Sequence, residues 1–268
     1  MPFHANIAPL DVHQLAMFRR DADVLLAIAT MSESAGPQVQ DRLKGEGVSA
    51  LLLSSTAPES TTVVGSANFT SAGHVVVSGY IAAKPTIVGV EAAVASLAGS
   101  FVRLRRGVEP PPTLAETPEG GIAVSKPVLF AADEGTTPSD VHAMLPRMLP
   151  STSVSRTSPL GVFWESYGIS VGDSVTFTVA ISRRSNPSLL ERVATAARLR
   201  TESLSTLAIA WRDQDRPNSN MRRVPILPRS VKVDLRELEP GDYALTVEAI
   251  ARSARAVSEP LLFTILDR

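Results

Sequence analysis

The chain has 268 residues, of which 44% are hydrophobic and 20% charged, which is typical of a globular protein with room for one large or two ordinary domains. Its formal net charge of −1 and its 5% of aromatic residues argue against nucleic acid as a partner, because neither a basic field nor many stacking platforms are present. The absence of cysteine excludes disulfides, thiolate catalysis and cysteine-ligated metals, and it leaves the compartment open.

The first half of the chain is predicted to form strands, because its apolar runs are short and are separated by glycine, proline and serine. The 20 prolines are spread along the chain and disfavour long helices. The strand-like runs of this part are residues 23–31, 48–55, 74–83, 86–94, 100–107 and 126–134.

Two further segments interrupt these runs. Residues 108–121 are rich in proline and acidic residues and are predicted to be an exposed connector. Residues 138–153 favour one short helical turn, which Ser139 or Asp140 would cap and Pro146 would end.

After residue 158 the sequence alternates with the two-residue period of a half-buried antiparallel strand. Within residues 173–182 one face would carry Val175, Phe177, Val179 and Ile181. Residues 231–235 and 243–250 repeat the alternation. The pattern is typical of a sheet with one face on a core and one in water.

Residues 186–211 allow two interpretations. Ser188 and Glu191 have the spacing of a capping box, and the apolar residues around them could line one face of a helix. The end of the segment, residues 203–211, is strand-like. A strand pairing is favoured, with a helical insertion at 186–203 as the alternative.

A tyrosine follows a Pro-Gly turn near the C-terminus. In immunoglobulin-like sandwiches, such a tyrosine at a strand start closes a corner by bonding its hydroxyl to nearby backbone. Leu238, Pro240, Gly241 and Tyr243 supply the leucine, the turn and the tyrosine. The alternative is a plain hairpin turn followed by an edge tyrosine, but the alternating strands on either side favour the sandwich corner.

These patterns together predict an all-β chain of two tandem immunoglobulin-like antiparallel β-sandwich domains. The N-terminal domain would comprise residues 1–150, with the connector at 108–121, and the C-terminal domain residues 151–268. No internal repeat of a fixed short period marks the two halves.

Residues 160–182 and 233–251 together resemble the β-sandwich region of bacterial GWxTD-domain proteins, which are exported or envelope proteins. In that family an aromatic-Trp-Glu-x-Tyr-Gly stretch precedes a strand, and a Leu-x-Pro-Gly-x-Tyr corner follows. The matching residues here are Phe163, Trp164, Glu165, Tyr167 and Gly168, then Leu238, Pro240, Gly241 and Tyr243. Residues 13–29 are similar to the start of the companion sandwich. The Gly-Trp-x-Thr-Asp signature itself is absent, so the resemblance implies a fold and an envelope location and no catalytic residues.

The histidines offer no metal site or acid–base pair. His4, His13, His74 and His142 lack the spacings that place two rings on one face of an element. We therefore predict no metal and no cofactor.

Glu165 is the one carboxylate that the sequence places between aromatic residues, Trp164 and Tyr167. A carboxylate in such a place can act as a general acid, or it can bond a tyrosine hydroxyl or backbone amides. No second carboxylate stands in a fixed relation to it, so the structural interpretation is favoured. We predict no catalytic residue and no enzyme.

Charge is segregated along the chain. Residues 183–223 contain nine arginines and four acidic residues, and residues 109–145 contain six acidic residues and one lysine. Arginine is the cation favoured at protein interfaces. The interface candidates are Arg183, Arg184, Arg192, Arg198, Arg200, Arg212, Arg216, Arg222 and Arg223. The alternatives are that these are solvated loops, or that the basic and acidic segments pair within the molecule.

The resulting hypothesis is a non-catalytic scaffolding subunit that binds other proteins in a larger, membrane-bound assembly through its edges, loops and arginine-rich face. The envelope resemblance implies a periplasmic, membrane-extrinsic position, and one concrete hypothesis is a photosynthetic reaction-centre and light-harvesting assembly. No run approaches the roughly 20 apolar residues of a membrane span. No signal peptide is visible, so a cytoplasmic location stays open. The alternatives are a carbohydrate-binding sandwich and a hydrolase with a dispersed site.

Overall fold

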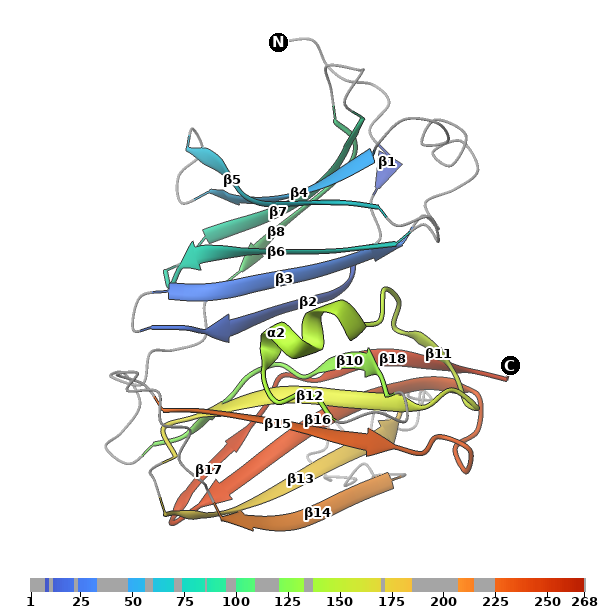
Figure 1. Ribbon diagram of the computed structural model, residues 1–268. Helices are drawn as coiled ribbons and strands as arrows, with labels where there is room; N and C mark the ends of the chain where they lie inside the picture. The colour runs from blue at the N-terminus through green and yellow to red at the C-terminus, as the bar shows by residue number, and fades with distance from the viewer. Residues whose placement is uncertain are drawn as a thin grey trace, which may run out of the picture.

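The computed structural model describes residues 8–9, 12–21, 24–32, 48–55, 60–69, 74–84, 86–94, 100–108, 121–132, 137–169, 172–184, 207–214 and 225–267. Within these ranges the chain is almost entirely β-structure, with one short helix, α2 (Val141–Met144), and a 3₁₀ turn, η1 (Leu145–Arg147). Figure 1 shows the strands stacked in layers, with the N-terminal strands in the upper half and the C-terminal strands in the lower half. The predicted all-β fold is confirmed.

The first sandwich is built from eight strands in two sheets. They are β1 (Ala8–Pro9), β2 (Val12–Arg19), β3 (Val24–Ser32), β4 (Val48–Ser55), β5 (Thr61–Asn68), β6 (His74–Ala82), β7 (Thr86–Val94) and β8 (Ser100–Val108). The small sheet has the order β2-β3-β6, and the large sheet has the order β1-β8-β7-β4-β5. Alternate residues of β3, such as Leu25 and Ala27, meet Leu52 and Val90 of the large sheet in one apolar core.

The second sandwich follows the same plan. Its strands are β9 (Ala123–Val124), β10 (Val128–Ala131), β11 (Ser153–Ser155), β12 (Leu160–Tyr167), β13 (Ser174–Arg183), β14 (Leu207–Gln214), β15 (Ile226–Val233), β16 (Gly241–Ala251), β17 (Ala254–Val257) and β18 (Leu261–Leu266). The small sheet has the order β10-β12-β15, with β9 also on β12, and the large sheet has the order β11-β18-β16-β13-β14, with β17 on β16.

The two sandwiches have similar sheet orders but differ in how their first strands are connected: β1 of the large sheet precedes β2 of the small sheet, whereas β10 of the small sheet precedes β11 of the large sheet. All strand pairs are antiparallel among the described residues, except that a short strand runs parallel to the last strand of each sandwich: β1 to β8, and β11 to β18. Each small sheet has a central strand, β3 or β12, between two neighbours. This arrangement of two packed antiparallel sheets is immunoglobulin-like, and the prediction of two tandem sandwiches of this class is confirmed.

The strands after residue 121 belong to the second sandwich. β9 and β10 pair with β12, and the N–H of Leu149 donates to the carbonyl of Leu129. The sheets thus divide between Val108 and Ala123, whereas the sequence pattern placed the division at residue 150. Because β10 is short and its first three residues are buried, it shows no alternation that would link it to the later strands.

Most predicted strands coincide with observed ones, but the observed strands outside every predicted run are β1, β2, β5, β9, β11, β12, β17 and β18. β5 exposes most of its side chains and has no apolar face, while β18 is apolar at nearly every position. The helical turn is present, and the Asp140 carboxylate caps it by accepting the N–H of Ala143 at 2.9 Å. β14 confirms the strand at the end of residues 186–211, and residues 186–203 lie outside the described part.

The tyrosine corner is also present. The Tyr243 hydroxyl donates to the carbonyl of Glu239 at 2.7 Å, and the Leu238 N–H donates to the carbonyl of Leu235 at 2.9 Å. Gly241 has φ +148°, a conformation that side chains rarely adopt. Tyr243 and Leu238 are both buried in the core of the second sandwich, so the plain hairpin alternative is wrong.

Trp164 fills the middle of this core and has no exposed surface. Its ring lies 5.6 Å from that of Phe177 and 5.8 Å from that of Trp211, in tilted and edge-on arrangements. The aromatic stretch that the resemblance placed ahead of a strand is itself most of β12.

Two glycines allow the sheets of the first sandwich to meet at one side. A Cβ on Gly65 of β5 would lie 2.0 Å from the carbonyl oxygen of Ser78, and one on Gly79 of β6 would lie 2.4 Å from that of Val64. The backbones of β5 and β6 therefore approach at a distance that excludes any side chain.

Candidate functional site

The central strands of the two small sheets are buried on both faces. All eight residues of β12 are buried, as are residues 25–31 of β3. A strand at the surface of a single sandwich would bury alternate residues only. The second faces of β3 and β12 are therefore covered by the contact between the sandwiches, which stacks four sheets with the two small sheets inside (Figure 1).

Apolar side chains from both sandwiches form this contact. Phe18 of β2 and Phe163 of β12 pack edge to face with ring centroids 5.9 Å apart. Phe130 of β10 lies flat on Gly161, where a Cβ would come within 2.3 Å of the ring. The remaining members of the cluster are Ala16, Leu26, Ile28, Val128, Ala132, Val141, Met144 and Met148. We call this set the inter-sandwich core.

The side chain of Gln14 makes a strand-like pairing across the boundary. Its Oε1 accepts the N–H of Leu129 at 2.7 Å, and its Nε2 donates to the carbonyls of Leu129 at 3.2 Å and Leu149 at 2.7 Å. Its own backbone N–H donates to Thr30 Oγ1 at 3.1 Å. A buried amide that satisfies both ends on another sandwich's backbone fixes the relative position of the two sheets.

A charged network completes the boundary. Arg20 binds both carboxylate oxygens of Glu165, at 2.8 and 3.1 Å, and these side chains are only 9% and 2% exposed. The Tyr167 hydroxyl donates to Glu165 Oε2 at 3.0 Å and accepts the backbone N–H of Arg19 at 3.0 Å. Burial, and next the negative charge of Glu165, raise the pKa of Tyr167 well above 10. Glu165 thus takes the structural role that the sequence favoured.

The arginines predicted as an interface do not meet in one patch, as far as the described residues show. Arg183 ends β13 and pairs with the carboxylate of Glu239, and Arg184 follows it at the surface. Arg212 lies opposite Thr176 of β13. Thr176 is seven residues before Arg183 on the same strand, so Arg212 and Arg183 are separated by roughly 23 Å along the sheet. The other predicted interface arginines lie outside the described residues: Arg192, Arg198, Arg200, Arg216, Arg222 and Arg223. The same holds for five of the six acidic residues of segment 109–145.

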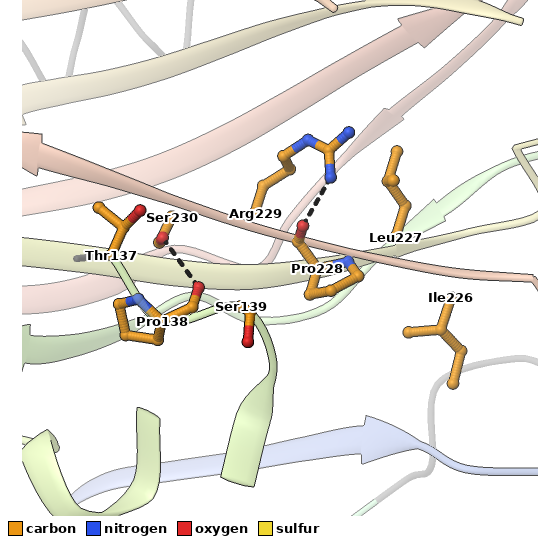
Figure 2. Close-up of a pocket in the computed structure, with 8 residues that line it drawn as sticks. All are labelled: Thr137, Pro138, Ser139, Ile226, Leu227, Pro228, Arg229 and Ser230. Carbon is orange, nitrogen blue, oxygen red and sulfur yellow. Dashed lines mark hydrogen bonds between the residues drawn. The ribbon is translucent and has the colours of Figure 1, made fainter. Parts of the chain in front are cut away.

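One hollow of about 410 Å³ lies beside β15, between that strand and the loop that leads into α2 (Figure 2). Ile226, Pro228 and Ser230 line it from β15, and Thr137 and Ser139 from the loop. The Ser230 hydroxyl donates to the carbonyl of Pro138 at 3.3 Å. No histidine or carboxylate is among the described residues that line it, so hydroxyls here have no base to activate them.

Strand β15 is protected along this edge. Pro228 lacks the N–H that a further strand would need, and the Arg229 guanidinium turns toward β14. Its Nε donates to Asp213 at 2.6 Å and its Nη1 to the carbonyl of Pro228 at 2.8 Å. This ion pair joins the edges of the two sheets of the second sandwich.

A second hollow, of about 330 Å³, lies on the outer face of the large sheet. Ser174, Thr176, Arg212, Ile250 and Arg252 line it. Arg212, Thr176 and Ile250 occupy opposite positions on the adjacent strands β14, β13 and β16. The Arg212 Nε donates to Ser174 Oγ at 2.5 Å, and Arg252 binds both oxygens of Asp173, at 2.9 and 2.8 Å.

Arg252 is the residue that the sequence interpretation missed at this hollow. It begins the turn between β16 and β17 with φ +55°, and no other described non-glycine residue has a positive φ. Glycine or asparagine is usual at such hairpin positions. What distinguishes Arg252 is therefore its backbone conformation, which the sequence does not show: there it is only an arginine in a polar turn.

His4 lies outside the described residues, and no group of three acidic or histidine side chains in the described ranges could hold a metal ion. The two tryptophans and three tyrosines all lie in the described part: Trp164, Tyr167 and Tyr243 are buried, Trp211 packs on the core of the second sandwich, and Tyr80 is exposed. Among the described residues no helix is long and apolar enough to cross a bilayer.

No family model matches the sequence, and no curated protein matches it. Among solved structures the chain is similar to the BSP domain of a biofilm associated protein, at 13% identity and a TM-score of 0.35, over 95% of this chain and 29% of that chain. It is also similar to the D0-D1 domain of intimin, at 14% identity and a TM-score of 0.27, over 94% of this chain and 98% of that chain. A red sea bream transglutaminase matches at 9% identity and a TM-score of 0.24, over 95% of this chain and 31% of that chain. The chain thus spans less than a third of the first of these structures.

Proposed function

We propose that this chain is a non-catalytic scaffolding module that binds other proteins and holds its binding surfaces in a fixed relation. The observation that carries the proposal is the inter-sandwich core with its buried Arg20–Glu165 pair. Tandem domains usually move on a linker unless their interface is apolar and well packed. A contact that buries both faces of β3 and β12 turns two sandwiches into one stiff body.

The composition of the two hollows supports binding over catalysis. Their described lining offers hydroxyls and arginines, with no nucleophile placed next to a base. The buried carboxylate of Glu165 is held by Arg20 and Tyr167 inside the boundary. These features give the dispersed-site hydrolase no support.

The aromatic residues do not favour the carbohydrate-binding alternative. A sandwich that stacks sugars needs a planar row of exposed tryptophan or tyrosine side chains. Tyr80 is the one such side chain with an exposed ring, at 55%, since the others face the cores.

The proposal also covers where the protein lies in the cell and what kind of partner it binds. An extracytoplasmic, membrane-peripheral position is supported by the resemblance of residues 160–182 and 233–251 to the sandwich region of GWxTD-domain proteins. We propose the partner as a protein subunit of a larger membrane assembly. That this assembly is photosynthetic stays a prediction from the sequence.

Co-purification of the native protein from its own cells, in mild detergent and at low salt, tests this function. The scaffold proposal expects one or more proteins at a fixed molar ratio, in a complex of defined mass by light scattering. The proposal would be contradicted if the protein were recovered alone, as a monomer, and hydrolysed glycoside or peptide substrates.

A further inference from the structure

We propose that the hollow between Arg212 and Arg252 binds a carboxylate side chain from an extended acidic segment of a protein partner. The inference rests on the proposed function and names the chemistry of the partner. It begins from the two guanidinium groups that lie on either side of Ser174 at the start of β13, over a hollow of about 330 Å³.

The local charges leave a positive excess. Asp173 neutralises Arg252, and Glu248 pairs with Arg255 on the neighbouring strand β17. Arg212 donates from Nε to the neutral hydroxyl of Ser174, and no described carboxylate forms an ion pair with it. A carboxylate in the hollow would meet the remaining N–H groups of Arg212 and the hydroxyl of Thr176, both of which line it.

The backbone at Arg252 is a second, independent observation. Its φ of +55° is costly for any residue with a Cβ, and glycine would fill the turn without strain. A non-glycine residue in such a strained conformation is expected where its side chain takes part in binding. Its guanidinium borders the same hollow as that of Arg212.

The edge of β14 that no described strand occupies indicates a peptide as the source of the carboxylate. β14 pairs with β13 on one side and with no described strand on the other. Unlike β15, it has no proline, and it presents the small side chains of Ala208 and Ala210 on the same face as Arg212. An extended segment that pairs with this edge would place every second side chain on that face, and an acidic residue opposite Arg212 would lie one strand spacing, roughly 5 Å, from it, within reach of the Arg212 guanidinium that borders the hollow.

The test is fluorescence anisotropy of the full chain with a labelled ten-residue peptide that alternates glutamate and threonine, compared with its glutamine–threonine counterpart. Wild type is expected to bind the glutamate peptide more tightly. Arg212→Gln and Arg252→Gly should each weaken that binding about ten-fold. Arg236→Gln is the matched control, because Arg236 is an exposed arginine paired with Asp234 away from the hollow, and it should leave the affinity unchanged.

Arg252→Gly also separates binding from folding, since glycine relieves the positive φ and the melting temperature should not fall. Equal binding by all variants, or equal binding of the two peptides, overturns the inference. So does a preference for a heparin-derived oligosaccharide over the peptide, which would assign the hollow to a sulfated polysaccharide. If the wild-type chain binds no peptide but still co-purifies at a fixed ratio with a protein, this inference fails and the scaffold function stands.

Discussion

Arg20 and Glu165 belong to different sandwiches, 145 residues apart in the chain, and form a bidentate ion pair that is almost fully buried. The side chain of Glu165 projects from the face of β12 that contacts the first sandwich, and Arg20 is the residue directly after the end of β2. Removing both charges from water is costly, and the two hydrogen bonds from Arg20 to Glu165 offset part of that cost, while the buried Nε of Arg20 has no described partner. The pair specifies which faces of the two sandwiches meet.

Replacement of Glu165 by glutamine is expected to destabilise the protein by about 3 kcal/mol, because it leaves the charge of Arg20 buried without its counter-charge. The shape of the side chain is kept, so the loss reports the charge. Urea unfolding of the two proteins measures it.

Glu239→Gln is the control for that change. Glu239 pairs with Arg183, but its side chain is 75% exposed, and an exposed pair contributes at most about 1 kcal/mol. If Glu165→Gln costs no more than Glu239→Gln, the buried pair does not hold the sandwiches together.

The raised pKa of Tyr167 predicts a loss of stability in alkali. Above about pH 10 the unfolded chain releases this proton while the folded chain keeps it, so the unfolded state binds fewer protons and the free energy of unfolding falls as pH rises. One such group contributes a slope of at most about 1.4 kcal/mol per pH unit. The stability is present below pH 10 and is lost as pH rises toward the folded pKa.

Tyr167→Phe should remove that part of the slope. Unfolding free energies of wild type and variant between pH 9 and pH 11 measure the difference, since all other groups titrate alike in both. Parallel pH profiles would show that Tyr167 ionises as easily in the folded protein as in the unfolded chain.

The close crossing of β5 and β6 predicts that Gly65→Ala disrupts the first sandwich. The added Cβ would lie 2.0 Å from the carbonyl oxygen of Ser78, so the strands must separate, at a cost of about 3 kcal/mol. Gly172→Ala is the control: no described atom apart from its chain neighbours lies within 4 Å of the added Cβ, and its φ of +85° opposes alanine at about 1 kcal/mol. Thermal unfolding of both variants compares them, and equal losses would mean that the crossing tolerates a methyl group.

The sequence predicts the individual strands better than the division between the two sandwiches, for a physical reason. β13 and β16 each bury one face and expose the other, so their residues alternate in polarity. β12 and β3 are buried on both faces and show no alternation, and nothing local in them indicates a second sandwich on the far side. The division of the chain depends on that far contact, as the pairing of β10 with β12 shows.

The candidate surface was predictable only in part. Arg212 belongs to an arginine-rich segment that composition reveals, but its relation to Arg252 depends on the pairing of β13 with both β14 and β16. These two residues are 40 positions apart in the sequence. The ion pair of Arg20 with Glu165 is equally invisible, because it is set by how two finished sandwiches pack.

The tyrosine corner permits a final comparison between two buried tyrosines. Tyr243 donates one hydrogen bond to the carbonyl of Glu239, whose residue is exposed, so water can replace the lost partner in Tyr243→Phe. That change is expected to cost about 1 kcal/mol. Tyr167 bonds both Glu165 and the N–H of Arg19 in the sealed boundary, so Tyr167→Phe leaves two buried groups short of a partner and should cost about 2 kcal/mol or more. Urea unfolding at pH 7 ranks the two variants. A larger loss for Tyr243→Phe would mean that the corner of the second sandwich, and not the boundary between the sandwiches, is the more tightly coupled to the global fold.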